Sequence, residues 1–215
     1  MTQEVQKRRE LTSGLWRALD RQHFELFYQP QLDFRSGRTI GFEALLRWNH
    51  PDRGMISPGD FIPLAESSDL IIPIGRWVLE RACTDCVRWR QQGHTNISVA
   101  VNVSYVQFRD GSLPQVVESV LCQTGLPAFL LELGLTESLL ISDDQSIQRQ
   151  LDRLHAMGVT LAIDDFGTGY SNVGYLRRFN ARRLKIDKSF VSALGVSQRD
   201  EPLVRAMIQM AHSLN

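Results

Sequence analysis

Apolar residues recur along the first part of the chain with two periods, and each period predicts a different element. In residues 4–20, leucines recur at every fourth position from Leu11 to Leu19, which predicts a helix. Two strand-like segments follow, Phe24–Phe34 and Thr39–Trp48. The turn-forming residues 35–38 between them predict a β-hairpin.

Helical spacing returns after the hairpin. Ser57, followed by Pro58 and by the acidic Asp60, is typical of a helix start. A longer helix is expected next, ended by Gly93. Its apolar face consists of Ile74, Trp77, Val78, Ala82, Cys86 and Trp89.

Strands and helices then alternate to the end of the chain. The expected strands are 97–104, 129–136, 159–164 and 183–186, and the expected helices are 113–124, one around 147–154 ended by Gly158, a short one after residue 164, and 203–214. Alternation of this kind predicts a parallel sheet, either open or closed into a barrel. The strands are apolar runs with polar residues at their ends, which is typical of strands covered by helices.

Composition narrows the function classes. The 24 Lys and Arg residues balance the 24 Asp and Glu residues, which disfavours a nucleic-acid-binding or membrane-surface role. No apolar stretch is long enough to span a bilayer, and the first residues lack the apolar core of a signal peptide. Cys83 and Cys86 fit one helix face and have no second pair, so packing is favoured over zinc binding. We expect a cytoplasmic globular domain without direct membrane contact.

Reactive side chains stand at the ends of several expected strands. Glu43 and Arg47 point to one side of their strand, and Asn102, Asp164 and Lys185 come late in theirs. In a (β/α) barrel the reactive groups stand at the C-terminal ends of the strands. Carboxylate and amide oxygens are ligands for Mg²⁺ or Mn²⁺, and two such ions can clamp a phosphodiester during hydrolysis.

Seven motifs occur in an order that resembles the EAL family of bacterial phosphodiesterases, which open cyclic di-GMP to the linear dinucleotide pGpG. They are Tyr28-Gln29-Pro30, Glu43-Ala44-Leu45-Leu46-Arg47-Trp48, Phe61-Ile62-Pro63-Leu64-Ala65-Glu66, Val101-Asn102-Val103-Ser104, Leu135-Thr136-Glu137-Ser138, Asp164-Asp165-Phe166-Gly167-Thr168-Gly169-Tyr170-Ser171 and Leu184-Lys185-Ile186-Asp187. The resemblance implies an α/β fold, a modified (β/α)₈ TIM-like barrel whose first strand is antiparallel.

The resemblance also implies residue roles. It assigns metal binding to Glu43, Asn102, Asp164 and Asp165, and substrate binding to Gln29, Leu46, Arg47 and Asp187. Catalysis would rest on Glu43, Asp164 and Lys185, with Lys185 orienting or deprotonating the attacking water. Glu137 would hold the loop Asp165–Ser171, with Gly167 and Gly169 as hinges. The implied cofactors are two Mg²⁺ or Mn²⁺ ions, with Ca²⁺ inhibitory because its coordination is longer and looser.

Two departures from the family pattern affect these expectations. Gly134 stands where the family has a metal-binding glutamate. The sequence also supplies only six barrel strands, so we expect a lead-in or linker helix over residues 1–22 and an EAL domain over 23–215 that is incomplete at its C-terminal end. The linker resembles one that follows a GGDEF domain. Besides cyclic di-GMP, the expected partners are a GGDEF or sensor domain in the same longer protein and a second copy of the chain in a homodimer. Any membrane anchor would belong to other domains of that longer protein.

Three interpretations therefore stay open. The first is a cyclic di-GMP phosphodiesterase that is weak or inactive in this chain because of Gly134 and the absent strands. The second is a non-catalytic cyclic di-GMP receptor, in which groove contacts such as Gln29 and Arg47 persist while metal binding fails. The third is a fragment with neither activity.

Overall fold

The structure is a computed structural model that describes residues 2–136, 139, 144–168, 179, 181–192, 194–195 and 200–213. Its strands are β1 (Phe24–Leu32), β2 (Thr39–His50), β3 (Gly54–Ile56), β4 (Ser98–Val103), β5 (Leu131–Thr136), β6 (Thr160–Phe166) and β7 (Arg183–Ile186). Its helices are α1 (Thr2–Asp20), α2 (Pro58–Ser67), α3 (Ile71–Gln91), α4 (Leu113–Thr124), α6 (Gln145–Ala156), α8 (Lys188–Ser192) and α9 (Asp200–Ser213), with 3₁₀ turns η1 (Tyr105–Phe108) and η2 (Ala128–Leu130).

The seven strands form one sheet in the order β1-β2-β4-β5-β6-β7, with the short β3 paired to β2. β1 and β3 run antiparallel to β2, and the remaining neighbours are parallel. Within the described residues the sheet is open, and β1 and β7 stand at its two ends. The expected α/β fold and its antiparallel first strand are therefore confirmed.

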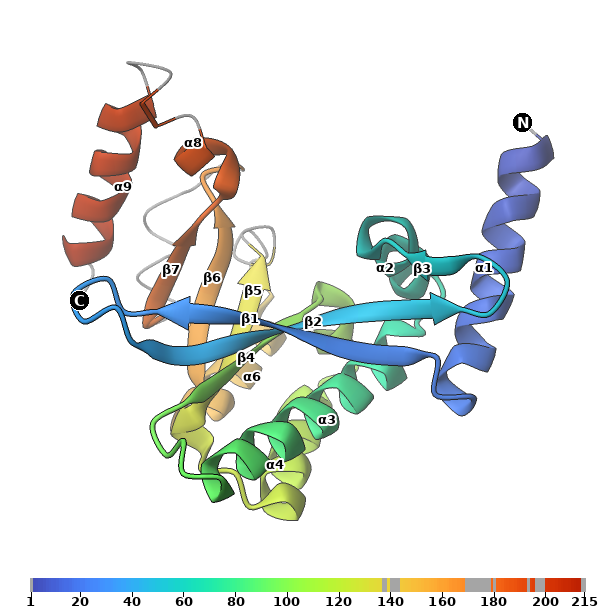
Figure 1. Ribbon diagram of the computed structural model, residues 1–215, viewed down its shortest axis with the longest axis horizontal. Helices are drawn as coiled ribbons and strands as arrows, with labels where there is room; N and C mark the ends of the chain where they lie inside the picture. The colour runs from blue at the N-terminus through green and yellow to red at the C-terminus, as the bar shows by residue number, and fades with distance from the viewer. Residues whose placement is uncertain are drawn as a thin grey trace.

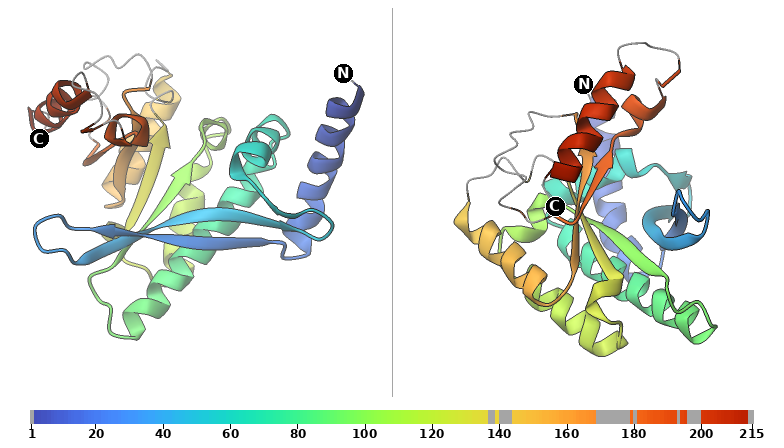
Figure 2. Two further views of the ribbon diagram at one scale, coloured as in Figure 1. Left: turned by 45° about the horizontal axis from the view of Figure 1, so that its top comes forward. Right: turned by 90° about the vertical axis from the view of Figure 1, so that its left-hand side faces the viewer.

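The parallel strands present different faces to the two sides of the sheet. In β4, Val99, Val101 and Val103 are buried in the hydrophobic core, while Asn102 between them is exposed. Helices α3, α4 and α6 lie together on the core side, and the β1–β2 hairpin extends across the molecule as a long twisted ribbon (Figures 1 and 2). The opposite side of the strands is thereby left for polar side chains, as the alternation along a strand requires.

The hairpin turn is longer than the sequence predicts. β1 ends at Leu32 rather than at Phe34, because Asp33 begins the turn. The Asp33 N–H donates to Arg38 O at 2.9 Å, and the Asp33 carboxylate accepts from Ser36 N at 2.7 Å. Gly37 has φ +67°, a left-handed conformation that glycine adopts without strain.

Most expected helices are present, with small corrections. Ser57 is the N-cap residue of α2, but its side chain makes no capping hydrogen bond, and the Ser57 carbonyl accepts from Asp60 N instead. The short strand β3 and helix α8 are additions that the sequence pattern did not predict. The short helix expected after residue 164 falls largely on residues outside the described part of the chain. None of the described helices is long and apolar enough to cross a membrane.

Helix α1, at the far end of the molecule from α9, packs on the sheet (Figure 1). Leu11, Leu15 and Ala18 are buried in the common core. A Cβ atom at Gly14 would lie 3.0 Å from the Trp48 ring, so this glycine permits close packing of helix on strand. The lead-in helix thus shares a core with the rest of the chain.

Candidate active site

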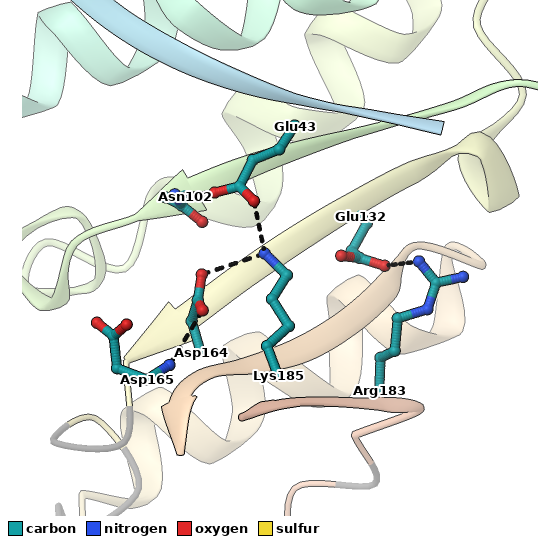
Figure 3. Close-up of polar contacts among 7 residues, drawn as sticks. All are labelled: Glu43, Asn102, Glu132, Asp164, Asp165, Arg183 and Lys185. Atoms are coloured by element: carbon teal, nitrogen blue, oxygen red, sulfur yellow. Dashed lines mark hydrogen bonds and ion pairs between the residues drawn. The ribbon is translucent and has the colours of Figure 1, made fainter. Parts of the chain in front are cut away.

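Side chains from four strands converge on the polar side of the sheet (Figure 3). Glu43 comes from β2, Asn102 from β4, Asp164 from β6 and Lys185 from β7. The sheet register brings them together, because Glu43 lies opposite Ala100 and Thr136 lies opposite Asp164 in neighbouring strands. The sequence placed Asn102, Asp164 and Lys185 late in their strands, and the structure shows that they meet Glu43.

Hydrogen bonds link these side chains directly. Asn102 Nδ2 donates to Glu43 Oε1 at 2.8 Å. Lys185 Nζ lies between two carboxylates, 3.1 Å from Asp164 Oδ2 and 3.4 Å from Glu43 Oε2. The Lys185, Glu43 and Asp164 side chains are about one-fifth exposed, so solvent reaches them from one side. The ammonium group therefore joins β7 to β2 and β6.

The carboxylates determine the charge state of Lys185. Burial acts to lower its pKa, but the negative charges of Asp164 and Glu43 outweigh burial and raise the pKa above its usual value. Lys185 is consequently a cation in this arrangement. A role as proton acceptor would require that its surroundings change first.

Asp165 differs from its neighbour Asp164. It has φ +53°, a left-handed conformation that is uncommon for a residue other than glycine, and its N–H donates to Asp164 Oδ1 at 3.0 Å. Burial and the negative charge of Asp164 raise the pKa of Asp165. The backbone conformation thus holds two carboxylates of adjacent residues near one another at the end of β6.

The donor set fits a hard divalent cation. Glu43, Asn102, Asp164 and Asp165 offer carboxylate and amide oxygens, the ligand class of Mg²⁺ and Mn²⁺. The carboxylates of Glu43 and Asp164 already share one positive group, the Lys185 ammonium. In the described part of the chain no three His, Cys, Asp or Glu side chains are grouped closely enough to hold a metal ion as they stand. The metal-binding role of the four residues stays a prediction.

The expected substrate-binding residues lie beside this site. Gln29 is exposed and pairs in register with Glu43 across the hairpin. The Arg47 guanidinium lies 5.3 Å from the centre of the Phe27 ring and donates to Leu46 O at 3.0 Å. Leu46, Arg47, Asn102 and Thr136 are among the residues that line a mainly apolar cavity of about 270 Å³.

The remaining expected site residues are described only in part. Asp187, expected to bind substrate, directly precedes α8. Its carboxylate accepts from Ser189 N at 2.9 Å, and hydrogen bonds from the Ser189 side chain and backbone lower the pKa of Asp187. Gly167 has φ +100°, and a Cβ atom there would lie 2.8 Å from the Phe190 ring. Glu137 and Gly169 lie outside the described residues. The substrate and loop-holding roles stay predictions.

Comparison with known proteins identifies the family. The family model of the EAL domain matches residues 13–215. The chain belongs to the EAL domain family. It is 41% identical over 215 residues to the bifunctional diguanylate cyclase/cyclic di-GMP phosphodiesterase MucR of Pseudomonas aeruginosa. It is 43% identical over 215 residues to the cyclic di-GMP phosphodiesterase NbdA of the same organism.

The solved structures agree with this assignment. The PaMucR phosphodiesterase in its c-di-GMP complex matches with a TM-score of 0.91 and 42% identity, over 96% of this chain and 83% of that chain. All of this chain aligns with MucR and NbdA, but it spans only 31% and 27% of their lengths. The family resemblance, the TIM-barrel-like fold and the family activity, cyclic di-GMP phosphodiesterase, are thereby confirmed.

Gly134 lies inside the site of this EAL domain. It pairs in register with Asn102 on one side and Ala162 on the other. A Cβ atom at Gly134 would overlap the Asn102 Oδ1 atom and would lie 3.5 Å from Asp164 Oδ2. Any side chain at this position would therefore project among the metal-ligand candidates, and the Asn102 amide occupies that space here.

The EAL domain also contains polar contacts whose role sequence reasoning did not assign. Ser104 Oγ donates to Glu66 Oε1 at 2.7 Å, and Ser104 N donates to Gln107 Oε1 at 3.0 Å. These three residues line the same cavity as Arg47. Glu66 and Ser104 each end an apolar motif in the sequence, which by itself does not reveal that these residues, 38 positions apart, are partners.

Proposed function

We propose that this EAL domain binds cyclic di-GMP on the polar side of the sheet. We propose further that this chain hydrolyses cyclic di-GMP to pGpG only weakly. The observation that carries the proposal is the convergence of Glu43, Asn102, Asp164 and Lys185 on one point. The relatives named above support the substrate, because MucR and NbdA are both named as cyclic di-GMP phosphodiesterases.

The chain's own residues have distinct tasks in this proposal. Arg47, which lines the cavity, would hold a phosphate of the dinucleotide through its guanidinium. Gln29, beside Glu43, would hydrogen-bond the ligand in the groove. Lys185 would orient a water molecule toward the phosphorus. Two Mg²⁺ or Mn²⁺ ions, held by Glu43, Asn102, Asp164 and Asp165, would supply the charge that activates water and stabilises the leaving oxygen.

Gly134 is the reason for expecting weak turnover. A carboxylate at this position would add negative charge between Asn102 and Asp164, where the metal ligands gather. Its absence lowers the charge and the number of oxygen donors available to the cations. The groove residues Gln29 and Arg47 come from β1 and β2 and do not depend on position 134.

The test is incubation of the chain with cyclic di-GMP and Mn²⁺, with pGpG separated by chromatography. We expect slow, metal-dependent formation of pGpG that Asp164→Asn abolishes. The control variant is Asp152→Asn on the exposed face of α6. Turnover that persists in Asp164→Asn would contradict the assignment of the site.

A non-catalytic cyclic di-GMP receptor is the second candidate. It is favoured by the position of Gly134 among the metal-ligand candidates while the groove residues are intact. Calorimetry with cyclic di-GMP in a chelator separates the two candidates. Tight binding without metal, together with no pGpG after long incubation with Mn²⁺, would favour the receptor.

A further inference from the structure

Glu132 is a buried carboxylate that no expected role uses. It lies on β5 two residues before Gly134, on the same side of the strand, and its side chain is only 2% exposed. Glu132 Oε2 accepts from Arg183 Nη1. Glu132 Oε1 is buried without a hydrogen-bond partner in the described part of the chain. A buried carboxylate oxygen in this state is costly, so a cause for it is required.

The unpartnered oxygen of Glu132 faces Lys185. In Figure 3 the oxygen of Glu132 that does not contact Arg183 points toward the Lys185 ammonium. The negative charge of Glu132 is also among the causes that raise the pKa of Lys185. Lys185 nevertheless donates to Asp164 and Glu43 in this structure and not to Glu132.

A divalent cation held by Glu43 and Asp164 would conflict with this placement of Lys185. Two like charges cannot share the space between the same carboxylates at low cost, because their repulsion is strong where solvent is partly excluded. Lys185 must then move and find another acceptor. Glu132 Oε1 is a suitable acceptor, because it is a buried carboxylate oxygen without a hydrogen-bond partner among the described residues. It also faces Lys185 in Figure 3.

We propose that Glu132 is a positioning residue that receives the Lys185 ammonium when a divalent cation occupies Glu43 and Asp164. This inference rests on the proposed function, since it concerns the metal-bound state of that site. The Glu132–Arg183 ion pair holds the carboxylate in place from the other side, with the Arg183 side chain 44% exposed. Without Glu132, the displaced ammonium would have to stay beside the cation and oppose its binding.

The test is a double-mutant cycle read by binding of Mn²⁺ alone, with free Mn²⁺ followed by electron paramagnetic resonance at constant pH and ionic strength. Glu132→Gln keeps the shape of the side chain and can still accept from Arg183. We expect it to weaken Mn²⁺ binding at least about tenfold, within the range that groups outside the first ligand shell contribute. In a Lys185→Met background, where no ammonium needs an acceptor, the same change should weaken binding less than about threefold.

The cycle separates positioning from simple charge. If Glu132 acted only through its negative charge, Glu132→Gln would weaken binding equally in both backgrounds, and that result would overturn the inference. Glu118→Gln on the exposed face of α4 removes one negative charge elsewhere and should leave Mn²⁺ binding unchanged. Thermal unfolding of each variant verifies that it is folded. If Glu132→Gln does not fold, Glu132→Asp, which keeps the charge but withdraws the oxygen, takes its place in the same cycle.

A crystal structure of the Mn²⁺-loaded chain provides the second measurement. We expect Lys185 Nζ within hydrogen-bonding distance of Glu132. Lys185 still between Glu43 and Asp164 beside the cation would overturn the inference and leave the proposed function intact. A chain that binds no Mn²⁺ would contradict the proposed metal-dependent function and this inference together.

Discussion

Replacement of Gly134 by glutamate tests the weakest part of the site. A Cβ atom at this position overlaps Asn102 Oδ1, so the Asn102 amide must rotate. That rotation gives up the 2.8 Å hydrogen bond from Asn102 Nδ2 to Glu43, and a hydrogen bond to a charged group contributes about 1.5–3 kcal/mol. The overlapping atom is the end of a short exposed side chain rather than backbone, so the strand itself need not shift.

When metal is bound, the contribution of an added carboxylate ligand should exceed the cost of losing the hydrogen bond between Asn102 and Glu43. Asn102 must in any case turn its oxygen toward a cation to act as a ligand, so the hydrogen bond to Glu43 is disturbed in both versions of the chain. Groups outside the first ligand shell already contribute about 10–100-fold to affinity or activity, and a direct carboxylate ligand should contribute no less. We therefore expect Gly134→Glu to raise phosphodiesterase activity at least about tenfold.

The assay is pGpG formation with Mn²⁺, measured beside Mn²⁺ affinity and cyclic di-GMP binding in a chelator. Gly134→Gln is the matched control, because it has the same size without the charge and should give no gain. Equal activity in the natural chain and Gly134→Glu would refute the reasoning and show that the site assembles without a carboxylate there. A gain in cyclic di-GMP binding without a gain in rate would favour the receptor.

Three further predictions concern stability and inhibition. Tyr28→Phe removes the 2.7 Å hydrogen bond to the buried Asp85 and should lower the free energy of unfolding by about 1.5 kcal/mol in denaturant titrations, whereas Tyr105→Phe, at an exposed position, should not. The raised pKa of Lys185 stabilises the fold below its unfolded pKa of about 10.5, and this contribution is lost as pH rises through the higher folded value. The free energy of unfolding of the natural chain should therefore fall more between pH 9 and 12 than that of Lys185→Met. Parallel curves of the two free energies against pH would contradict the assignment of Lys185 as a cation. Ca²⁺ in place of Mn²⁺ should suppress pGpG formation while cyclic di-GMP binding persists, and undiminished turnover in Ca²⁺ would argue against the expected coordination.

The order and type of the elements follow from the sequence. Alternating apolar runs and helical repeats are local signals, and they located β4, β5, β6 and the helices between them within a few residues. Motif residues at strand ends also indicated one polar site, because the C-terminal ends of parallel strands share an edge. The hairpin turn was predicted, but its start at Asp33 was missed, since a side-chain hydrogen bond with Ser36 decides it. Strand β3 was also missed, because pairing with β2 decides it.

The contacts within the site depend on tertiary structure alone. Lys185 and Glu43 are 142 residues apart in sequence, and only the register of the sheet from β2 to β7 brings the ammonium between Glu43 and Asp164. The position of the Asn102 amide where a Gly134 side chain would lie, and the unpartnered oxygen of Glu132, likewise depend on how neighbouring strands face each other. A sequence pattern specifies which side of a strand a residue occupies, but packing across strands decides which charge it meets.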